Sequence, residues 1–233
     1  MKYFVRVLLM MICCCVFMFA ADGVIQSRWA DSDPHLDTNP MSSFWRGSEP
    51  VYMELNALGK AEPKYRTEIR TRWTKNNLYF LFVCPYEELN LKPNPNTSAE
   101  TNELWNWDVA EVFIGTDFKN IKRYKEFEIS PQGEWVDLDI DLDRQHDDSG
   151  WKWNSNLEVS SRIDKGTRVW YGAMRIPYAS IDSRPAAAGN RLRINLFRCQ
   201  GPNSSRHYIA WQPPMRESFH TPERFGTLEL VQK

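Results

Sequence analysis

The feature that most constrains the fold is an alternation of polar and apolar residues between positions 104 and 143. A period of two places successive side chains on opposite faces of a β-sheet. The segment Pro131-Gln132-Gly133 interrupts the alternation and is typical of a hairpin turn. We therefore predict an antiparallel meander with one packed apolar face and one wet face that carries carboxylates and aromatic rings. Its strands are expected at 109–114, 124–130 and 135–142.

The rest of the chain continues as short strand-like stretches between turn residues. No helical period is longer than a turn or two, and one such turn is expected at Pro177–Ile181. This spacing predicts an all-β fold, an antiparallel β-sandwich of the jelly-roll kind, in a single domain over residues 25–233. An irregular lead-in is expected at 31–50. Further strands are expected at 52–55, 67–73, 78–83, 157–163, 168–176, 191–198, 208–211 and 227–231.

The N-terminus has the pattern of an export signal. Lys2 and Arg6 precede an uncharged apolar run from Val7 to Ala21, which has the length of a signal peptide and is short for a membrane span. We expect residues 1–21 to be removed and the mature protein to be periplasmic, on the cell surface or extracellular, with no membrane contact beyond export. An uncleaved anchor, or a lipoprotein signal at Cys13-Cys14-Cys15, is the alternative.

Composition indicates which kinds of ligand the protein is suited to bind. The net charge of -1 gives no electrostatic reason for binding nucleic acid. The chain carries 10 Trp, 9 Tyr and 12 Phe, which suits both a core of large side chains and an aromatic ligand surface. Cys84 and Cys199 remain after export; a disulfide between them is one hypothesis and two separate thiols the other.

Four motifs between residues 105 and 228 carry a family resemblance. They are Trp105-x-x-Asp108-x-x-Glu111-Val112-Phe113-Ile114; Tyr124-x-Glu126-Phe127-Glu128-Ile129-Ser130-Pro131-x-Gly133-Glu134; Trp153-Asn154-Ser155; and Trp211-x-Pro213 followed by His220-Thr221-Pro222-Glu223-Arg224-Phe225-Gly226-x-Leu228. In this order they resemble carbohydrate-binding module family 9 and its family 9-like relatives, in the DOMON-like superfamily. The resemblance covers roughly residues 25–233. It implies a non-catalytic β-sandwich that binds a saccharide or polysaccharide beside polysaccharide-degrading enzymes, without an organic cofactor.

The resemblance also implies a site in which two aromatic walls hold a sugar and polar groups bind its hydroxyls. Trp105 falls at one wall, and Phe219 falls at the other, where the best-known members carry Trp. Glu111 falls at the family's hydroxyl acceptor. Core packing of Trp105 and a simple solvated role for Glu111 are the alternatives. Three further candidates are Arg206, near a family arginine, Arg216, in place of the ligand asparagine, and His220, which could equally be an ordinary surface residue.

A row of carboxylates raises the question of a metal. Asp137, Asp139 and Asp141 share one face of the expected third strand, and Asp143 continues the row. Calcium prefers six to eight oxygen ligands, and members of the resembled family bind it structurally. We therefore expect a structural calcium ion, either in this row or elsewhere in the domain. The loop with Asp147-Asp148 adds further candidate ligands.

Two other functions stay open beside saccharide binding. A glycoside hydrolase would need two carboxylates at a suitable separation, and Glu126 and Glu128 share a strand face. A DOMON-type haem or redox domain would need axial His or Met ligands, and neither Met174 nor the four His forms a recognisable set. Because nothing marks a distinct acid and base, we favour binding over catalysis.

Overall fold

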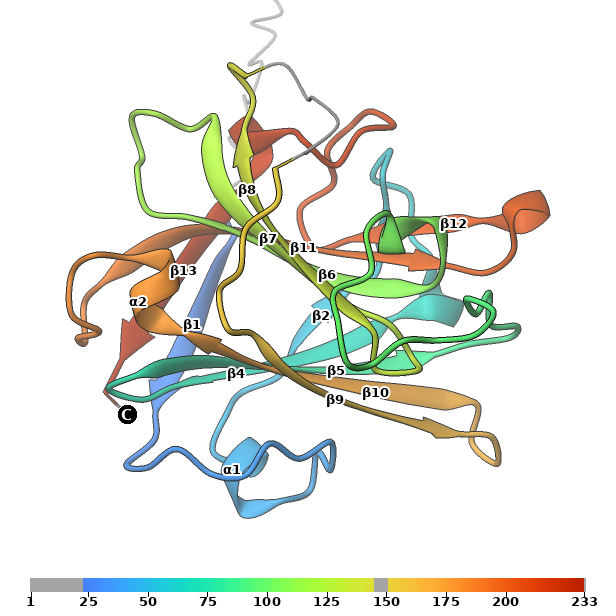
Figure 1. Cartoon of the computed structure of the whole chain (residues 1–233), viewed down its shortest axis with the longest axis horizontal. Helices are drawn as coiled ribbons and strands as arrows, with labels where there is room; N and C mark the ends of the chain where they lie inside the picture. The colour runs from blue at the N-terminus through green and yellow to red at the C-terminus, as the bar shows by residue number, and fades with distance from the viewer. Residues whose placement is uncertain (1–22, 145–150, 233) are drawn as a thin grey trace, which may run out of the picture.

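The structure is a computed structural model that describes residues 23–144 and 151–232. Within these residues thirteen strands form one continuous sheet (Figure 1). The strands are β1 Val24–Trp29, β2 Val51–Met53, β3 Leu55–Asn56, β4 Thr67–Trp73, β5 Asn77–Pro85, β6 Val109–Gly115, β7 Arg123–Ile129, β8 Trp135–Asp141, β9 Glu158–Asp164, β10 Val169–Pro177, β11 Arg191–Gln200, β12 His207–Ala210 and β13 Gly226–Val231.

Helices in the described residues are limited to single turns. The two α-helices are α1, Ser43–Arg46, and α2, Tyr178–Ile181, and the second is the helical turn expected from the sequence. The 3-10 turns are η1 Pro63–Tyr65, η2 Leu104–Asn106, η3 Asn203–Ser205 and η4 Pro222–Arg224. No helix among the described residues has the length and apolar character needed to span a bilayer.

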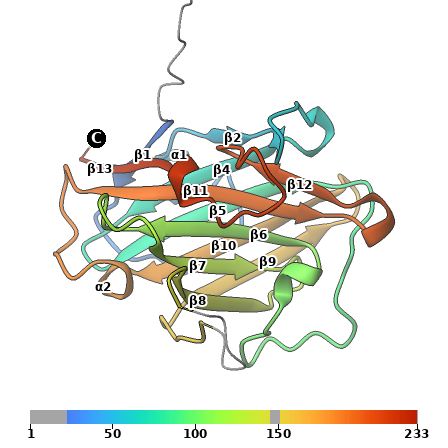
Figure 2. The same cartoon turned by 90° about the horizontal axis from the view of Figure 1, so that it is seen from above.

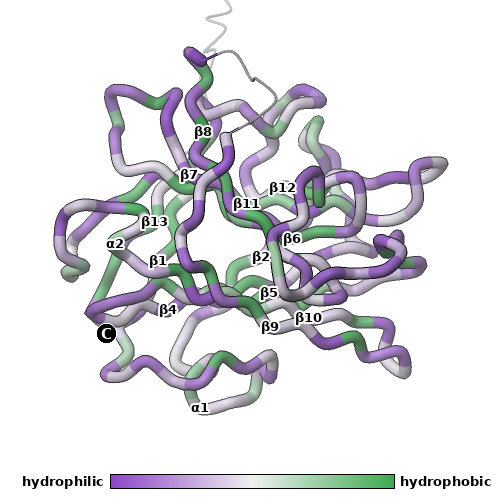
Figure 3. The backbone as a smooth tube through the Cα atoms, in the orientation of Figure 1, coloured by the Kyte–Doolittle hydropathy of each residue, from purple (hydrophilic) through white to green (hydrophobic). Residues whose placement is uncertain are grey.

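The sheet folds back on itself into two packed layers, which Figure 2 shows from above. One layer has the strand order β8-β7-β6-β11-β13, the other has the order β4-β5-β10-β9, and β1 joins them. The core between the layers receives fully buried side chains from both, among them Phe82, Ile129 and Trp170. Hydrophobic residues accordingly concentrate on the central strands, and the outer loops are mostly hydrophilic (Figure 3).

The all-β architecture is confirmed, but the sheet is mixed rather than antiparallel. Strand β1 pairs in parallel with β13 on one side and with β4 on the other. The sequence pattern gave no strand before residue 52, because Val24–Trp29 is short and its alternation is weak. The two pairings that join the layers, β1 with β13 and β1 with β4, thus involve a strand that the sequence pattern did not indicate.

The meander at the centre of the chain forms as predicted. Strand β6 pairs antiparallel with β7, and β7 pairs antiparallel with β8. Gly133 closes the β7–β8 hairpin with a φ of 88°, a left-handed conformation that favours glycine. The expected wet face is wrong for β6, because every residue of that strand is buried. The loop segments that include Asn102–Asn106 and Glu217–His220 line the cavity on the face that carries the carboxylates.

The disulfide hypothesis is also wrong, since Cys84 and Cys199 are both free and buried. Cys84 on β5 belongs to the core between the two layers. Cys199 on β11 belongs to a second apolar cluster, on the far face of the β6–β11 layer. The layer itself therefore separates the two thiols. The expected signal peptide and the Asp147-Asp148 loop lie outside the described residues.

Candidate functional site

A cavity of about 350 Å³ opens on the face of the β6–β7–β11 layer that points away from the core. Its floor comes from the strands, and its rim comes from η2, the segment after β11 and the segment between β12 and η4. Five of the six ligand residues expected from the sequence line it: Trp105, Glu111, Arg206, Phe219 and His220. The other lining residues are Asn102, Asn106, Phe113, Glu126, Leu138, Trp151, Cys199, Asn203, Tyr208 and Glu217.

Trp105 forms one wall from the 3-10 turn η2. Glu103 begins this turn with a φ of 58°, a left-handed conformation unusual for a residue with a Cβ. The Trp105 side chain is half-buried at the edge of the second apolar cluster. Trp107, two residues further along, does not line the cavity. The wall is therefore a single indole that is partly open to the cavity.

Phe219 forms the opposite part of the lining. Its ring stacks on that of Phe197, with centroids 4.1 Å apart and 10° between the ring planes. The ring of Tyr208 meets it edge-on at 5.8 Å. Phe197 itself is fully buried on β11. A loop residue is thus held by a ring that belongs to the rigid sheet.

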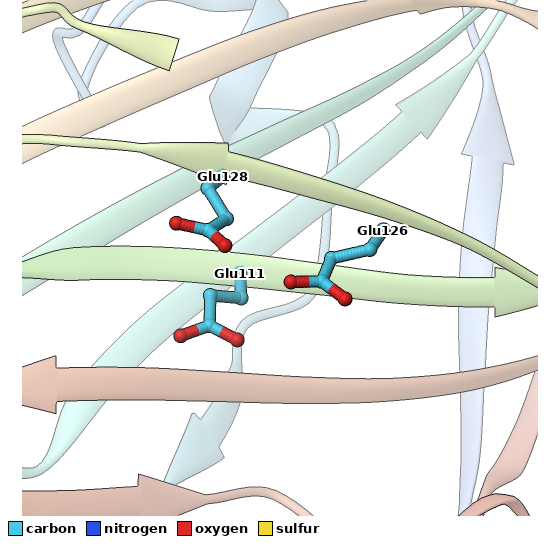
Figure 4. Close-up of side chains that lie close together, drawn as sticks. All are labelled: Glu111, Glu126 and Glu128. Atoms are coloured by element: carbon cyan, nitrogen blue, oxygen red, sulfur yellow. The ribbon is translucent and has the colours of Figure 1, made fainter. Parts of the chain in front are cut away.

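The floor carries three buried glutamates on neighbouring strands. Glu111 lies on β6 directly opposite Glu128 on β7, and Glu126 follows two positions away on the same face. Their exposed fractions are 2%, 3% and 0% for Glu111, Glu126 and Glu128. One carboxylate oxygen from each lies within 4.8 Å of those of the other two, and Figure 4 shows the three groups gathered together. The alternative of a solvated Glu111 is therefore wrong.

Burial dominates the electrostatics of these acids. It is the largest cause that raises the pKa of Glu111, and the negative charge of Glu126 raises it further. Burial likewise raises the pKa of Glu128, with further contributions from Glu111 and Glu126. The pKa of Glu126 is raised by burial as well. Each charged form is penalised because the cluster is removed from water and holds like charges together.

Arg206 positions the Trp105 wall. Its guanidinium donates to the carbonyl oxygens of Trp105 at 2.7 Å, Trp107 at 2.6 Å and Gly201 at 2.9 Å. It also lies 3.8 Å from the buried Asp108 carboxylate. Burial raises the pKa of Asp108 to about 6, although backbone N–H groups such as that of Gly201 oppose the shift. Arg206 therefore joins η2 to the segment after β11.

His220 and Arg216 have different environments. The Nδ1 atom of His220 lies 2.6 Å from the hydroxyl of Tyr124, and the imidazole packs near Phe113 and Trp151 on the cavity wall. Arg216 instead donates to Thr221 at 2.9 Å and to Glu223 at 2.5 Å, outside the cavity lining. A direct ligand role thus fits the position of His220 better than that of Arg216.

The aspartate row on β8 is already engaged by protein groups. Asp137 is buried and accepts hydrogen bonds from the backbone N–H and the hydroxyl of Ser155. Asp139 pairs with Lys125 at 2.7 Å. Asp141 pairs with two arginines, at 3.2 and 3.3 Å. Calcium in this row stays a prediction, and its ligands would have to exchange these partners for the ion.

The sequence pattern pointed to both walls and to Glu111, but not to the cluster of three glutamates. Glu126 and Glu128 were visible as a same-face pair. Their position opposite Glu111 depends on the β6–β7 register, which a sequence alone does not fix. The neighbour Cys199 is brought to the cavity by the pairing of β11 with β6, and Tyr208 by the pairing of β12 with β11.

Comparison with known proteins finds relatives of two kinds. The chain is 28% identical over 112 residues to the UPF0462 protein C4orf33 homolog of Rattus norvegicus, covering 48% of this chain and 49% of that protein. It is 21% identical over 211 residues to endo-1,4-beta-xylanase A of Thermotoga neapolitana, covering 90% of this chain but 18% of the enzyme. The chain thus spans about half the length of the first relatives it matches, and less of the xylanase.

Two solved structures share the fold. A candidate carbohydrate-binding protein of Bacteroides uniformis superposes with a TM-score of 0.72 at 15% identity, covering 90% of this chain and 100% of that one. A carbohydrate-binding module of family 9 from Caldicellulosiruptor kristjanssonii, in complex with cellotriose, gives a TM-score of 0.63 at 14% identity, covering 91% and 95%. The model of the family described as carbohydrate family 9 binding domain-like matches residues 36–233. The protein therefore belongs to the carbohydrate family 9 binding domain-like family.

Proposed function

We propose that the protein is a non-catalytic module that binds a saccharide in the cavity between Trp105 and Phe219. The observation that carries this proposal is the convergence of two aromatic side chains from distant loops on the buried carboxylate of Glu111. Sugars present apolar C–H faces that stack on aromatic rings and hydroxyls that need polar partners. The cavity offers both within one enclosed volume.

The size and the lining of the cavity suit a small part of a glycan. Its volume of about 350 Å³ lies at the lower end of the roughly 300–1,000 Å³ usual for ligand sites. Glu111 supplies a directional acceptor, and Asn102, Asn106 and Asn203 add amide groups at the rim. A neighbouring cleft shares Arg206 and Tyr208 with the cavity. A longer saccharide could therefore extend from the cavity past Tyr208.

The comparisons suggest which ligands to try first. Related structures of family 9 modules are in complex with cellotriose and with glucose, so glucose and cello-oligosaccharides are the first candidates. The match to a piece of a xylanase makes xylo-oligosaccharides the second. We further propose that the chain is exported and acts beside polysaccharide-degrading enzymes. The apolar N-terminal run and the family membership support this setting.

Binding should be measured by affinity electrophoresis against soluble polysaccharides, followed by calorimetry with oligosaccharides. Removing the Glu111 carboxyl group leaves the sugar hydroxyls that it would bind without a partner, at a cost of about 1–3 kcal/mol, so Glu111→Ala should weaken binding about tenfold. Glu158→Ala on the exposed edge strand β9 is the control and should bind like the parent. Failure of the parent to bind any glucose- or xylose-based saccharide at millimolar concentration would reject these two sugar classes.

A further inference from the structure

The three glutamates on the cavity floor lack the partners that buried acids normally have. Both carboxylate oxygens of Glu128 and the Oε2 atom of Glu126 are buried without a hydrogen-bond donor among the described residues. Among the described residues, the hydrogen-bond donor to Glu111 is the thiol of Cys199, at 3.4 Å, and a thiol is a weak donor. Buried carboxylates are usually hydrogen-bonded, paired with a cation or bound to a metal. The described residues therefore leave this cluster with unused acceptor oxygens, which a ligand could fill.

No side-chain cation of the described residues fills this need. Arg206 lines the same cavity, but its terminal nitrogens donate to backbone carbonyl oxygens of the rim. The described ion pairs include none that involves Glu111, Glu126 or Glu128. The neighbours Phe113 and Leu138 on the same face of the sheet are apolar, and His220 is the other titratable nitrogen base in the described lining. Three acids thus converge where the described residues offer them no paired cation.

We propose that Glu111, Glu126 and Glu128 together bind one divalent cation of about the size of calcium on the floor of the cavity. Calcium binds carboxylate oxygens at about 2.3–2.6 Å, so oxygens on opposite sides of one ion are about 5 Å apart. The separation of at most 4.8 Å between the three groups fits this span. Magnesium demands near-ideal octahedral geometry at about 2.0–2.1 Å and gives up its water reluctantly, so we expect it to bind here more weakly.

The charges and the scaffold support the same assignment. A dication balances most of the charge of three carboxylates, and hard oxygen ligands select cations of the calcium and manganese type over softer metals. All three glutamates stand on the paired strands β6 and β7, so their spacing is fixed by the sheet. Glu111 and Glu126 line the cavity. A cation held here would keep coordination positions toward the cavity, where water or, on the proposed function, sugar hydroxyls could complete them.

The test is calorimetry on the full chain after exhaustive chelation, with calcium, magnesium and manganese chlorides in turn. We expect one calcium ion per chain, weaker magnesium binding and a higher melting temperature with calcium. Glu128→Gln keeps the side-chain shape and removes one charge, so it should weaken calcium binding at least tenfold and abolish the shift in melting temperature. Glu158→Gln, on β9, is the matched control and should respond like the parent.

A third variant separates this site from the aspartate row. If Asp139→Asn abolishes the calcium response and Glu128→Gln keeps it, the ion lies on β8 and the proposal is wrong. The proposal is also wrong if the parent chain gives neither binding heat nor a shift in melting temperature with any of the three cations. The carboxyl groups would then be neutralised by protons that they share. Binding of glucosamine in place of metal would overturn it as well, because the occupant would then be an ammonium group.

The result can be distinguished from that of the saccharide experiments. Calcium binding without affinity for any saccharide would support the cation site and reject the proposed function. Saccharide binding that is equally tight in excess chelator, with no calcium bound, would support the proposed function and reject the cation site. Saccharide binding that weakens on chelation and is restored by calcium would support both.

Discussion

The rings of Phe219 and Phe197 lie nearly parallel, with centroids 4.1 Å apart. Phe197 is fully buried on β11, where it stands opposite Glu111 in the register with β6. The stack therefore fixes a loop side chain beside the acidic floor of the cavity. Because one face of Phe219 is covered by Phe197, only its other face and its edge can meet a ligand.

Phe219→Ala should weaken saccharide binding about tenfold, because an aromatic contact contributes about 1–2 kcal/mol. Phe219→Trp should preserve or tighten binding, since a larger ring offers more surface on the same side. Calorimetry with the best ligand from the screen measures both. The control is Phe118→Ala on the exposed β6–β7 turn, which should have no effect. Equal affinities for Phe219→Ala and the parent would remove Phe219 from the site.

Trp105→Ala tests whether this indole is a ligand wall or a core residue. The side chain is half-buried, so the variant should lose less than the roughly 3–5 kcal/mol typical of a fully buried tryptophan and should still weaken binding about tenfold or more. Trp107→Ala, two residues away and outside the cavity, is the matched control. Thermal melts and calorimetry of both variants decide the question. A Trp105→Ala chain that is strongly destabilised yet binds normally would identify a purely structural residue.

Arg206→Lys keeps the positive charge but cannot bond three carbonyl oxygens with a planar fork. We expect weaker saccharide binding together with a loss of about 1–3 kcal/mol in the free energy of unfolding, because η2 and its indole lose their support. Arg216→Lys, outside the cavity lining, should leave binding unchanged. Urea unfolding and calorimetry measure the two effects. Normal binding by Arg206→Lys would show that the rim keeps its shape without the guanidinium.

Hydrolysis is the remaining rival to binding. The three glutamates lie on one floor, and burial raises the pKa of each, but no residue stands out as a distinct acid opposite a distinct base. We expect no release of reducing sugar from cellulose, xylan or their oligosaccharides. Turnover by the parent that disappears in Glu126→Gln would establish a glycoside hydrolase instead.

Acid should weaken the fold through Asp33. Partial burial alone would raise the pKa of its carboxyl group, but hydrogen bonds from Thr74, Asn77, Asn76 and Tyr79 lower it to about 2. A carboxyl whose pKa is depressed on folding stabilises the protein above its unfolded value of 3.8, and this contribution is lost as the pH falls toward 2. Because the group is mostly exposed, we expect only about 1 kcal/mol.

The measurement compares Asp33→Ala with the parent by urea unfolding at several pH values. The difference in unfolding free energy should be present at pH 7 and should shrink steadily between about pH 4 and 2. A difference that does not change over this interval would show that Asp33 acts through packing rather than through its charge.

The sequence predicted those parts of the fold that depend on local alternation. The match at Thr67–Trp73 and the Gly133 hairpin are examples, since both are encoded by neighbouring residues. What escaped prediction depends on pairing between distant segments. The parallel role of Val24–Trp29 and the convergence of Glu126 and Glu128 on Glu111 arise from registers that a one-residue slip would change.

The residues of the candidate site likewise divide into those that a local motif indicated and those that depend on distant contacts. Trp105 and Glu111 lie in one of the quoted motifs and Phe219 directly precedes another, so the sequence pointed to three residues that line one cavity. The sequence did not indicate that Phe197 stacks on Phe219 or that Arg206 donates to the rim, because these contacts join residues far apart in the chain. The burial of the glutamates likewise results from loops whose course no periodicity describes.

The parallel pairing of β1 with β13 has a consequence for the order of folding. Val24 lies opposite Thr227 and Arg28 lies opposite Val231. Strand β1 can therefore complete this pairing only after β13 has been synthesised. During synthesis the early strands β4 and β5 can form a hairpin at once, but the edge of β1 that faces β13 stays without its partner until the C-terminus leaves the ribosome. Contacts of such long sequence separation slow folding. A nascent chain halted before Gly226 should therefore remain sensitive to protease, and completion of those last residues should make it resistant.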